Sequence, residues 1–308
     1  MVLLAVLGAI GIIYIMIVQM SADVIFSSQY YQQVMFRERS YYMARSALSG
    51  IMQIFTLDTN DYDSLDEQWA KEIPPYHLDE ENVYLSFRIE DMERYINPNY
   101  LLADSGEPEE KHVKQFRRLL KKLLLDPDLT NAVLDWLDED EERRMPLGAE
   151  GMDYDKSGFL AKGGKLDSID ELKLVKGFKN EMFSKRVVDY KVIPGLLDVL
   201  ALPSNGKINV NTAGRDVLLS LDDDMDEDVV AEIIRRRQDK PFEKMDDLLE
   251  LPGMNHDLLF RIKQLADVKS EYFKITVSVE NYSGDKADLV VITKRSGSSS
   301  SIVYWKVE

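Results

Sequence analysis

The first twenty positions of the chain are apolar almost without a break. The run MVLLAVLGAIGIIYIMIVQM contains no charged residue, and the first charge along the chain is Asp23. About 20 apolar residues, rising 1.5 Å each in a helix, span the roughly 30 Å hydrocarbon core of a bilayer. A cleaved secretory signal would have a shorter apolar region preceded by basic residues. The pattern therefore predicts that residues 1–20 are the transmembrane part of a helix.

An apolar stripe at helical spacing continues beyond this segment. Neither proline nor glycine occurs between Gly11 and Gly50, so residues 21–55 are predicted to prolong the same helix outside the membrane. Such a helix would be about 80 Å long. A stripe of this length predicts partners along the helix. Its members are Val34, Met35, Tyr41, Tyr42, Leu48, Ile51, Met52 and Phe55.

Apolar and polar residues alternate in four further segments, which are predicted to be strands. The first is residues 82–91, and the other three lie in residues 271–308, where SGSSSS forms a hairpin loop. Neighbouring strands usually pair, so one antiparallel sheet should collect all four. Residues 97–263 show helical patterns instead. The predicted fold is α+β: a long N-terminal helix packed on an antiparallel sheet formed by residues 56–96 and 266–308, with an all-α insertion domain at residues 97–265.

The insertion contains a weak internal repeat. Residues 168–178 (SIDELKLVKGF) align with residues 244–254 (KMDDLLELPGM), and Gly177 and Gly253 are predicted to end helical turns in the left-handed conformation. This is the pattern of a helix-hairpin-helix element, whose DNA-binding versions hold phosphate on hairpin amides. Here the hairpin at residues 222–228 is DDDMDED, which would repel phosphate.

Two Ile-Asn-x-Asn steps stand out, in RYINPNYL and in GKINVNTAGRDVL. Asparagine and threonine side chains accept hydrogen bonds from the free amides at helix starts, so Asn211 or Thr212 is predicted to cap the helix that follows.

Charge and composition narrow the possible functions. The 308-residue chain has a net charge of −17 and no cysteine, which argues against nucleic acid as the main partner and excludes disulfides and thiolate chemistry. The three histidines, His77, His112 and His256, lie in unrelated segments without metal-ligand spacing. No nucleophile elbow, P-loop or dinucleotide fingerprint occurs, so an enzyme is not expected.

The acidic loop at residues 135–158 is the candidate metal site. Carboxylates at a helix C-terminus oppose the helix dipole, and a bound cation would reverse that repulsion. Calcium takes oxygen ligands along loops with glycine turns, here Gly148, Gly151 and Gly158. The loop is not an EF-hand, because Gly164 stands at the twelfth position; a solvated loop without an ion is the alternative. The predicted calcium ligands are Asp138, Asp140, Glu150, Asp153 and Asp155.

Several stretches together resemble the minor pseudopilin K family (GspK) of type II secretion systems. They are RYINPNYL, AVLDWLDEDEERRMPLGAEGMDY, LDSIDELKLVKGF, GKINVNTAGRDVL and SEYFKITV, which occur in the family's order over nearly the whole chain. Most pilins have a glutamate at the fifth mature position, whereas K members usually lack it. If Met1 lies near the mature start, Ala5 stands there. The short basic leader of prepilins is absent from this sequence.

The resemblance implies a non-enzymatic subunit in the inner membrane, anchored by a single pass, with its bulk in the periplasm. It implies that the chain caps the pseudopilus tip for protein export. Implied partners are the minor pseudopilins I, J and H through the N-terminal helix, and secreted substrate at the tip. Calcium binding in the α-domain of some members points to the same acidic loop. The resemblance also implies that the two Ile-Asn-x-Asn steps lie at the junctions of the insertion, where Asn97, Asn99, Asn209 and Asn211 would cap helices and bond backbone. A membrane-anchored helix-hairpin-helix DNA receptor of the competence type is the alternative, and the acidic hairpin argues against it.

Overall fold

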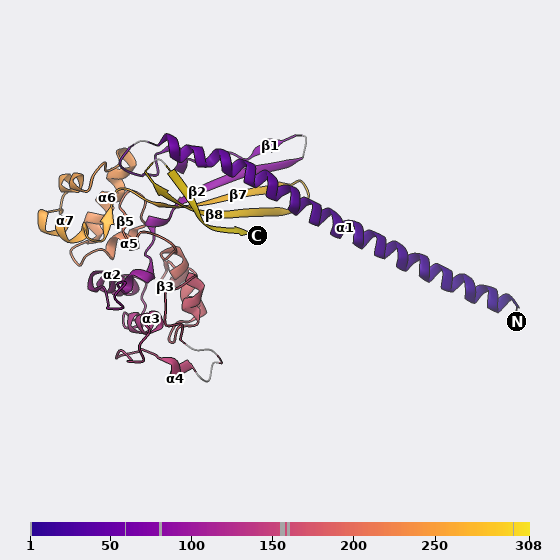
Figure 1. Cartoon of the computed structure of the whole chain (residues 1–308), viewed down its shortest axis with the longest axis horizontal. Coiled ribbons are helices and arrows are strands. Elements are labelled where there is room, and N and C mark those ends of the chain that lie inside the picture. The colour runs from indigo at the N-terminus through magenta and orange to yellow at the C-terminus, as the bar shows by residue number, and fades with distance from the viewer. Residues whose placement is uncertain (1, 59, 80–81, 155–157, 159–160, 298) are drawn as a thin grey trace.

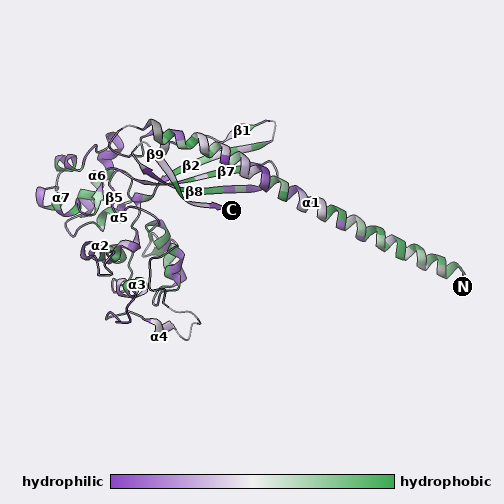
Figure 2. Cartoon of the chain, in the orientation of Figure 1, coloured by the Kyte–Doolittle hydropathy of each residue, from purple (hydrophilic) through white to green (hydrophobic). Residues whose placement is uncertain are grey.

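A long N-terminal helix dominates the shape of the protein. The structure is a computed structural model, and it describes residues 2–58, 60–79, 82–154, 158, 161–297 and 299–308. Helix α1 (Val2–Leu57) runs as one element of 56 residues and projects far beyond the rest of the molecule (Figure 1). Hydrophobic residues fill its projecting half (Figure 2). The predicted continuous helix is confirmed.

A five-stranded antiparallel sheet lies under the second half of α1. Its strand order is β1-β2-β7-β8-β9. The strands are β1 (Tyr76–Leu78), β2 (Val83–Asp91), β7 (Tyr272–Asn281), β8 (Lys286–Ser296) and β9 (Ser299–Val307). The four predicted strands are confirmed. Strand β1 was missed, because Pro74 and Pro75 leave only three residues of pattern before the turn.

Strand alternation puts one apolar face of the sheet against α1. Ile275, Val277 and Val279 are fully buried there, and Phe55 of α1 packs against Phe273 with ring centroids 4.7 Å apart. Leu48 also belongs to this core and is 3% exposed. Leu48 therefore fastens the helix to the sheet and is unavailable to a partner, contrary to the prediction from the stripe.

The segment between β2 and β7 folds around a second hydrophobic core. Its α-helices are α2 (Glu110–Lys122), α3 (Leu129–Leu137), α4 (Gly151–Tyr154), α5 (Arg215–Leu219), α6 (Glu227–Asp239) and α7 (His256–Ile262). The same segment also contains two small two-stranded sheets. One pairs β3 (Arg186–Val188) with β4 (Lys191–Ile193), and the other pairs β5 (Ile208–Asn209) with β6 (Ala266–Asp267). The fold class is confirmed, although the insertion is not wholly helical.

Many of the predicted helices in the insertion are single 3₁₀ turns. Within the insertion these are η3 (Pro98–Leu101), η5 (Ile169–Lys173), η6 (Asn180–Phe183), η7 (Leu196–Asp198) and η8 (Met245–Glu250); η1 (Gln68–Ala70) and η2 (Met92–Arg94) lie before it. The turns η5 and η8 are the two halves of the internal repeat. Gly177 and Gly253 follow them with φ of +92° and +84°, so their predicted left-handed conformation is confirmed. A Cβ at Gly177 would stand 2.6 Å from Leu129 Cδ2.

Asparagine side chains tie the insertion to the sheet. Asn209 is fully buried and donates to Asp63 O at 3.0 Å, Asp91 Oδ2 at 3.1 Å and Ser270 Oγ at 2.8 Å. Asn211 bonds both backbone groups of Phe242, at 2.9 Å each. The predicted bonding to backbone at the junction is thus present at both residues.

The predicted helix cap at Asn211 or Thr212 is wrong. Helix α5 begins after Gly214, which caps it without a side-chain bond, while Thr212 donates to Asp91 Oδ2 at 2.5 Å. Asn211 and Thr212 instead form hydrogen bonds with residues that are distant in sequence. A local capping pattern does not predict such bonds. Asn97 does cap a turn, since its side chain accepts from Asn99 N at 3.0 Å at the start of η3.

Candidate functional site

Three of the five predicted calcium ligands come together. Oxygen atoms of Asp138, Asp140 and Glu150 lie within 4.8 Å of one another. Asp138 ends α3, and Glu150 directly precedes α4, so the loop between the two helices folds back to place them side by side. Asp138 and Glu150 are buried and Asp140 is exposed, so the cluster opens to solvent on one side.

The remaining two predicted ligands are not part of this cluster. Asp153 forms ion pairs with Arg143 and with Lys176, whose Nζ lies 2.8 Å away, and it accepts from Glu150 N at 3.1 Å. The Lys176 hydrogen bond is the largest cause that lowers the pKa of Asp153, to about 2. In this structure Asp153 is therefore a paired carboxylate that braces the loop, and it is not one of the three carboxylates that come together. Asp155 lies outside the described residues.

Two residues that the sequence reasoning missed support the cluster. Asp135 is fully buried behind it, and Arg144 Nη1 lies 2.9 Å from Asp135 Oδ1 and also bonds Asp138 Oδ2. Gly148 is required here, because a Cβ would lie 2.3 Å from Asp135 Oδ2 and 2.1 Å from Arg144 O. The available signal was Asp135 itself, a charged residue between Leu134 and Trp136 in a largely apolar helix.

The negative charge of the cluster is not fully compensated, which favours binding of a cation. Burial is the largest cause that raises the pKa of Glu150, to about 7, and the charges of Asp135 and Asp138 add to it. Burial also raises the pKa of Asp138. Asp138 Oδ1 and Glu150 Oε1 are buried and make no hydrogen bond to any residue that the structure describes. Unpaired buried carboxylate oxygens are costly, so these atoms fit the oxygen ligands of a hard cation.

A second acidic group contrasts with this one. Carboxylate oxygens of Asp58, Asp63 and Glu67 also lie within 4.8 Å of one another. Arg295 Nη1 lies 2.6 Å from Asp58 Oδ2, and its Nη2 bonds Asp63. There the buried guanidinium already supplies the positive charge. The loop cluster is therefore the better candidate for a metal ion.

The acidic hairpin after α5 is neutralised by the protein itself. Arg261 Nη2 lies 2.8 Å from Asp222 Oδ1 and 2.5 Å from Asp224 Oδ2, and Arg118 Nε lies 2.8 Å from Asp223 Oδ1. Asp226 caps α6 by accepting from Val229 N at 2.9 Å. The helix terminus that could receive a phosphate already carries a carboxylate. This chemistry disfavours DNA recognition by the hairpin.

The basic cluster near this hairpin is also engaged locally. Arg235 pairs with Glu232 at 2.9 Å, Arg236 donates to Lys240 O at 2.5 Å, and Arg237 donates to Val210 O at 2.7 Å. Arg235 therefore neutralises a nearby acid, whereas Arg237 binds a backbone carbonyl.

The outer part of α1 presents apolar side chains to solvent. Val2–Phe55 is the one helix among the described residues that is long and apolar enough to cross a membrane, and its most apolar window is wholly exposed. Beyond residue 20, Phe26, Tyr31 and Tyr42 remain 73%, 63% and 61% exposed. Single exposed apolar residues need no explanation, but a row of large ones along a helix marks an interaction surface.

The fold and these surfaces define a class of protein: a pilin-like subunit with an apolar N-terminal helix fit to anchor it and a large inserted domain. Two family profiles, both described as type II secretion system (T2SS) protein K, match residues 95–187 and 208–268. Together they cover half of the chain. The chain belongs to the type II secretion system protein K family, whose members are minor pseudopilins.

Individual relatives agree with this assignment. Type II secretion system protein K of Aeromonas hydrophila is 27% identical in an alignment 266 residues long, which covers 79% of this chain and 77% of the relative. The GspK-GspI-GspJ complex of the type 2 secretion system of enterotoxigenic Escherichia coli contains a similar fold. Its TM-score is 0.67 at 19% identity, and the match covers 92% of this chain and 98% of that chain.

Proposed function

We propose that the protein caps the tip of a type II secretion pseudopilus and helps to start its assembly, without enzymatic activity of its own. The observation that carries this proposal is the position of the insertion. Helices α2 to α7 lie at the end of the sheet opposite the projecting N-terminus of α1 (Figure 1). In a filament whose subunits align their N-terminal helices, the insertion would occupy the place of a further subunit above.

The proposed orientation follows from α1. Residues 1–20 would anchor the chain in the inner membrane, with the sheet and the insertion in the periplasm. The neighbours would be the minor pseudopilins I and J, with H below them. The structural relative comes from a complex of K with I and J, which supports this choice of partners. Secreted substrate would meet the exposed insertion at the tip.

The exposed apolar side chains of α1 are the proposed contact with the siblings. Tyr42 is the best probe, since it is 61% exposed and lies outside the core between helix and sheet. Tyr42→Asp should abolish co-purification of the full-length chain with I and J, because a carboxylate would be buried without a partner. Ser49→Asp adds the same charge at an exposed polar site of α1 and should leave binding intact.

The same two variants should give different results in a secretion assay: Tyr42→Asp should abolish export, and Ser49→Asp should preserve it. Equal co-purification of both variants with the siblings would show that this face of α1 is not the contact.

We further propose that the loop cluster holds a calcium ion between Asp138, Asp140 and Glu150. The ion would supply positive charge only, fastening the end of α3 to the start of α4. Arg144 keeps Asp135 and one oxygen of Asp138 paired, and this leaves Asp138 Oδ1 and Glu150 Oε1 for the ion. Hard oxygen ligands without cysteine or paired histidine favour calcium over transition metals.

A further inference from the structure

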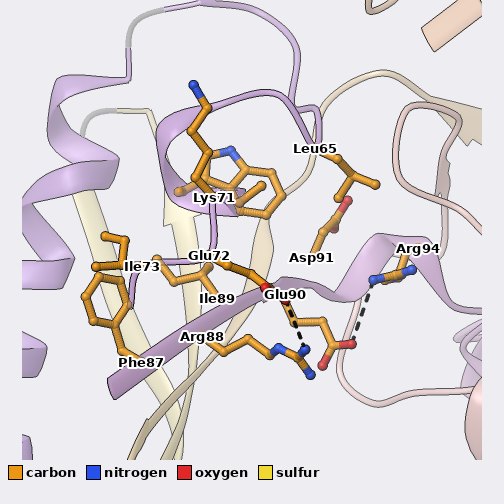
Figure 3. A pocket seen from close by; sticks show the side chains of 12 residues that line it. Leu65, Lys71, Glu72, Ile73, Phe87, Arg88, Ile89, Glu90, Asp91 and Arg94 are labelled. Carbon is orange, nitrogen blue, oxygen red and sulfur yellow. Dashed lines mark ion pairs between the residues drawn. The ribbon is translucent and has the colours of Figure 1, made fainter. Parts of the chain in front are cut away.

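One edge of the sheet is left open along most of its length. Strand β2 has nine residues, whereas β1 has three and pairs only with Val83–Leu85. No strand of the described residues therefore pairs with residues 86–90 of β2 on that side. A cavity of about 370 Å³ lies there, between β2 and the segment of residues 65–73 (Figure 3). This volume is within the usual range for ligand sites.

The main-chain groups at this edge can be assigned from the ladder. Asn281 N donates to Asp285 O at 3.0 Å, so the odd-numbered residues of β7 turn their polar groups toward β8. The direction of the backbone N–H and C=O groups alternates along a strand, and odd-numbered residues of β2 lie opposite odd-numbered residues of β7. The odd-numbered residues of β2 therefore direct these groups away from β7. The N–H and C=O groups of Phe87 and Ile89 face the cavity. Within the described chain, neither forms a backbone hydrogen bond with residues 65–73.

Strand β1 cannot be extended along this edge. Tyr76 pairs with Leu85, so a longer β1 would set Pro74 opposite Phe87 and Pro75 opposite Ser86. Proline has no N–H to donate and stops the ladder at this point. A second copy is no better suited as an occupant, because its own edge carries the same prolines and the same covering segment.

We propose that this groove accepts an extended segment of another polypeptide as an extra strand, antiparallel to β2 and in line with β1. A strand beside residues 86–90 would be about 17 Å long. Main-chain bonds to Phe87 and Ile89 would hold it, as in other complexes formed by strand addition. This site is independent of the α1 contact and of the calcium cluster.

The lining fixes the side-chain pattern of the ligand. Phe87 and Ile89 point to the same side as the α1 core, where Leu65, Trp69 and Ile73 line the cavity, so the ligand residues opposite them should be apolar. The residue opposite Arg88 should be acidic and the one opposite Glu90 basic, since cross-strand charge pairs of opposite sign are favourable.

One weak ion pair crosses the groove. Arg88 Nη2 and Glu72 Oε1 lie 3.7 Å apart across its mouth, and their side chains are 73% and 92% exposed (Figure 3). An ion pair this exposed contributes little and is readily exchanged for a new partner. Glu90 also lies within 3.9 Å of Arg94.

The test uses the full-length chain in detergent and a designed peptide, Lys-Val-Glu-Val-Thr-amide. A fluorophore is attached to the N-terminal amine of this peptide, so the lysine side chain keeps its charge. In the antiparallel register its valines lie opposite Ile89 and Phe87 and its glutamate opposite Arg88. Fluorescence anisotropy should show saturable binding, and hydrogen exchange at Phe87 and Ile89 should slow. N-methylation of both valines should weaken binding at least about tenfold, because it removes the two donors. N-methylation of the glutamate, whose N–H points away, should change binding less than about twofold.

A charge exchange provides the specificity control. Arg88→Glu should lose the peptide and instead bind the version with lysine in place of glutamate. Pro74→Val with Pro75→Thr should let β1 extend, fill the groove from within and block the peptide. If the peptide fails to bind, or if both kinds of N-methylation weaken it equally, the groove is a solvated, protected edge and the proposal is wrong.

Discussion

Replacing Glu150 by glutamine should remove the calcium response of the protein. Glu150 is 7% exposed, its Oε1 has no hydrogen-bond partner, and it shares a 4.8 Å cluster with Asp138 and Asp140. Glutamine keeps the size of the side chain but cannot offer an anionic ligand. Asp153→Asn is the matched control, because Asp153 is engaged by Arg143 and Lys176 and should not ligate the ion.

The size of the effect follows from binding linkage. An ion that binds only the folded state at one hundred times its Kd stabilises it by about 2.7 kcal/mol. For a domain of the size of the insertion, each kcal/mol raises the Tm by about 2–4 °C. Calcium should therefore raise the Tm of the insertion by about 5–10 °C at saturation. Magnesium should do less, because it requires a smaller and stricter octahedral shell.

The protonation of Glu150 gives a second signature. Its raised pKa, about 7, means that part of the Glu150 population carries a proton at neutral pH without the ion. Calcium must displace that proton, so binding at neutral pH should release protons. Without the ion, the raised pKa makes the folded state more stable near pH 5 than near pH 8. This contribution is lost as the pH rises from the ordinary glutamate range through 7.

Titration calorimetry of the chelator-stripped, full-length chain in two buffers of different ionisation enthalpy measures both quantities. Wild type and Asp153→Asn should bind calcium and release the proton, and Glu150→Gln should do neither. If calcium gives no heat and leaves the Tm unchanged in wild type, the cluster is a solvated acidic loop. Equal loss in both variants would instead contradict the assignment of Asp153 as a bracing residue.

Two further predictions concern stability. Burial and the nearby Asp91 raise the pKa of Glu93 to about 9, so the folded state should lose stability as the pH rises from about 5 to 9; denaturant unfolding should show this decline in wild type and a flatter profile in Glu93→Gln. Gly177→Ala should destabilise by about 1–3 kcal/mol more than Gly106→Ala. Both glycines have positive φ, but only at Gly177 would the new methyl group meet Leu129; equal unfolding midpoints for the two alanine variants would contradict this reasoning.

Elements that depend on local periodicity were predictable from the sequence. The continuous α1 and the four long strands follow from spacing and alternation, and the turns at Gly177 and Gly253 follow from the repeat. The 3₁₀ turns η5 and η8 could not be told from α-helix, because a few apolar residues at short spacing fit both forms. The short strand β1 carried too little pattern before its two prolines to be recognised.

The candidate site was only partly accessible from the sequence. The acidic loop with its glycine turns pointed to Asp138, Asp140 and Glu150, three carboxylates that the fold brings together. The sequence could not show that Lys176, 23 positions after Asp153, would take that carboxylate out of the cluster. The capping error at Asn211 has the same origin, because its partner Phe242 lies 31 residues away. In both cases a polar side chain bonds a residue that is distant in sequence and comes close only in the folded structure.

Native mass spectrometry tests the central claim most directly. The full-length chain would be co-expressed with the minor pseudopilins I and J of its own host and purified in detergent. A subunit that caps a tip should form one complex containing a single copy of each protein, and Tyr42→Asp should release the K subunit from it while Ser49→Asp should not. Recovery of the chain alone, or of multiple copies of it in one assembly, would contradict the proposal that it is a tip-capping minor pseudopilin.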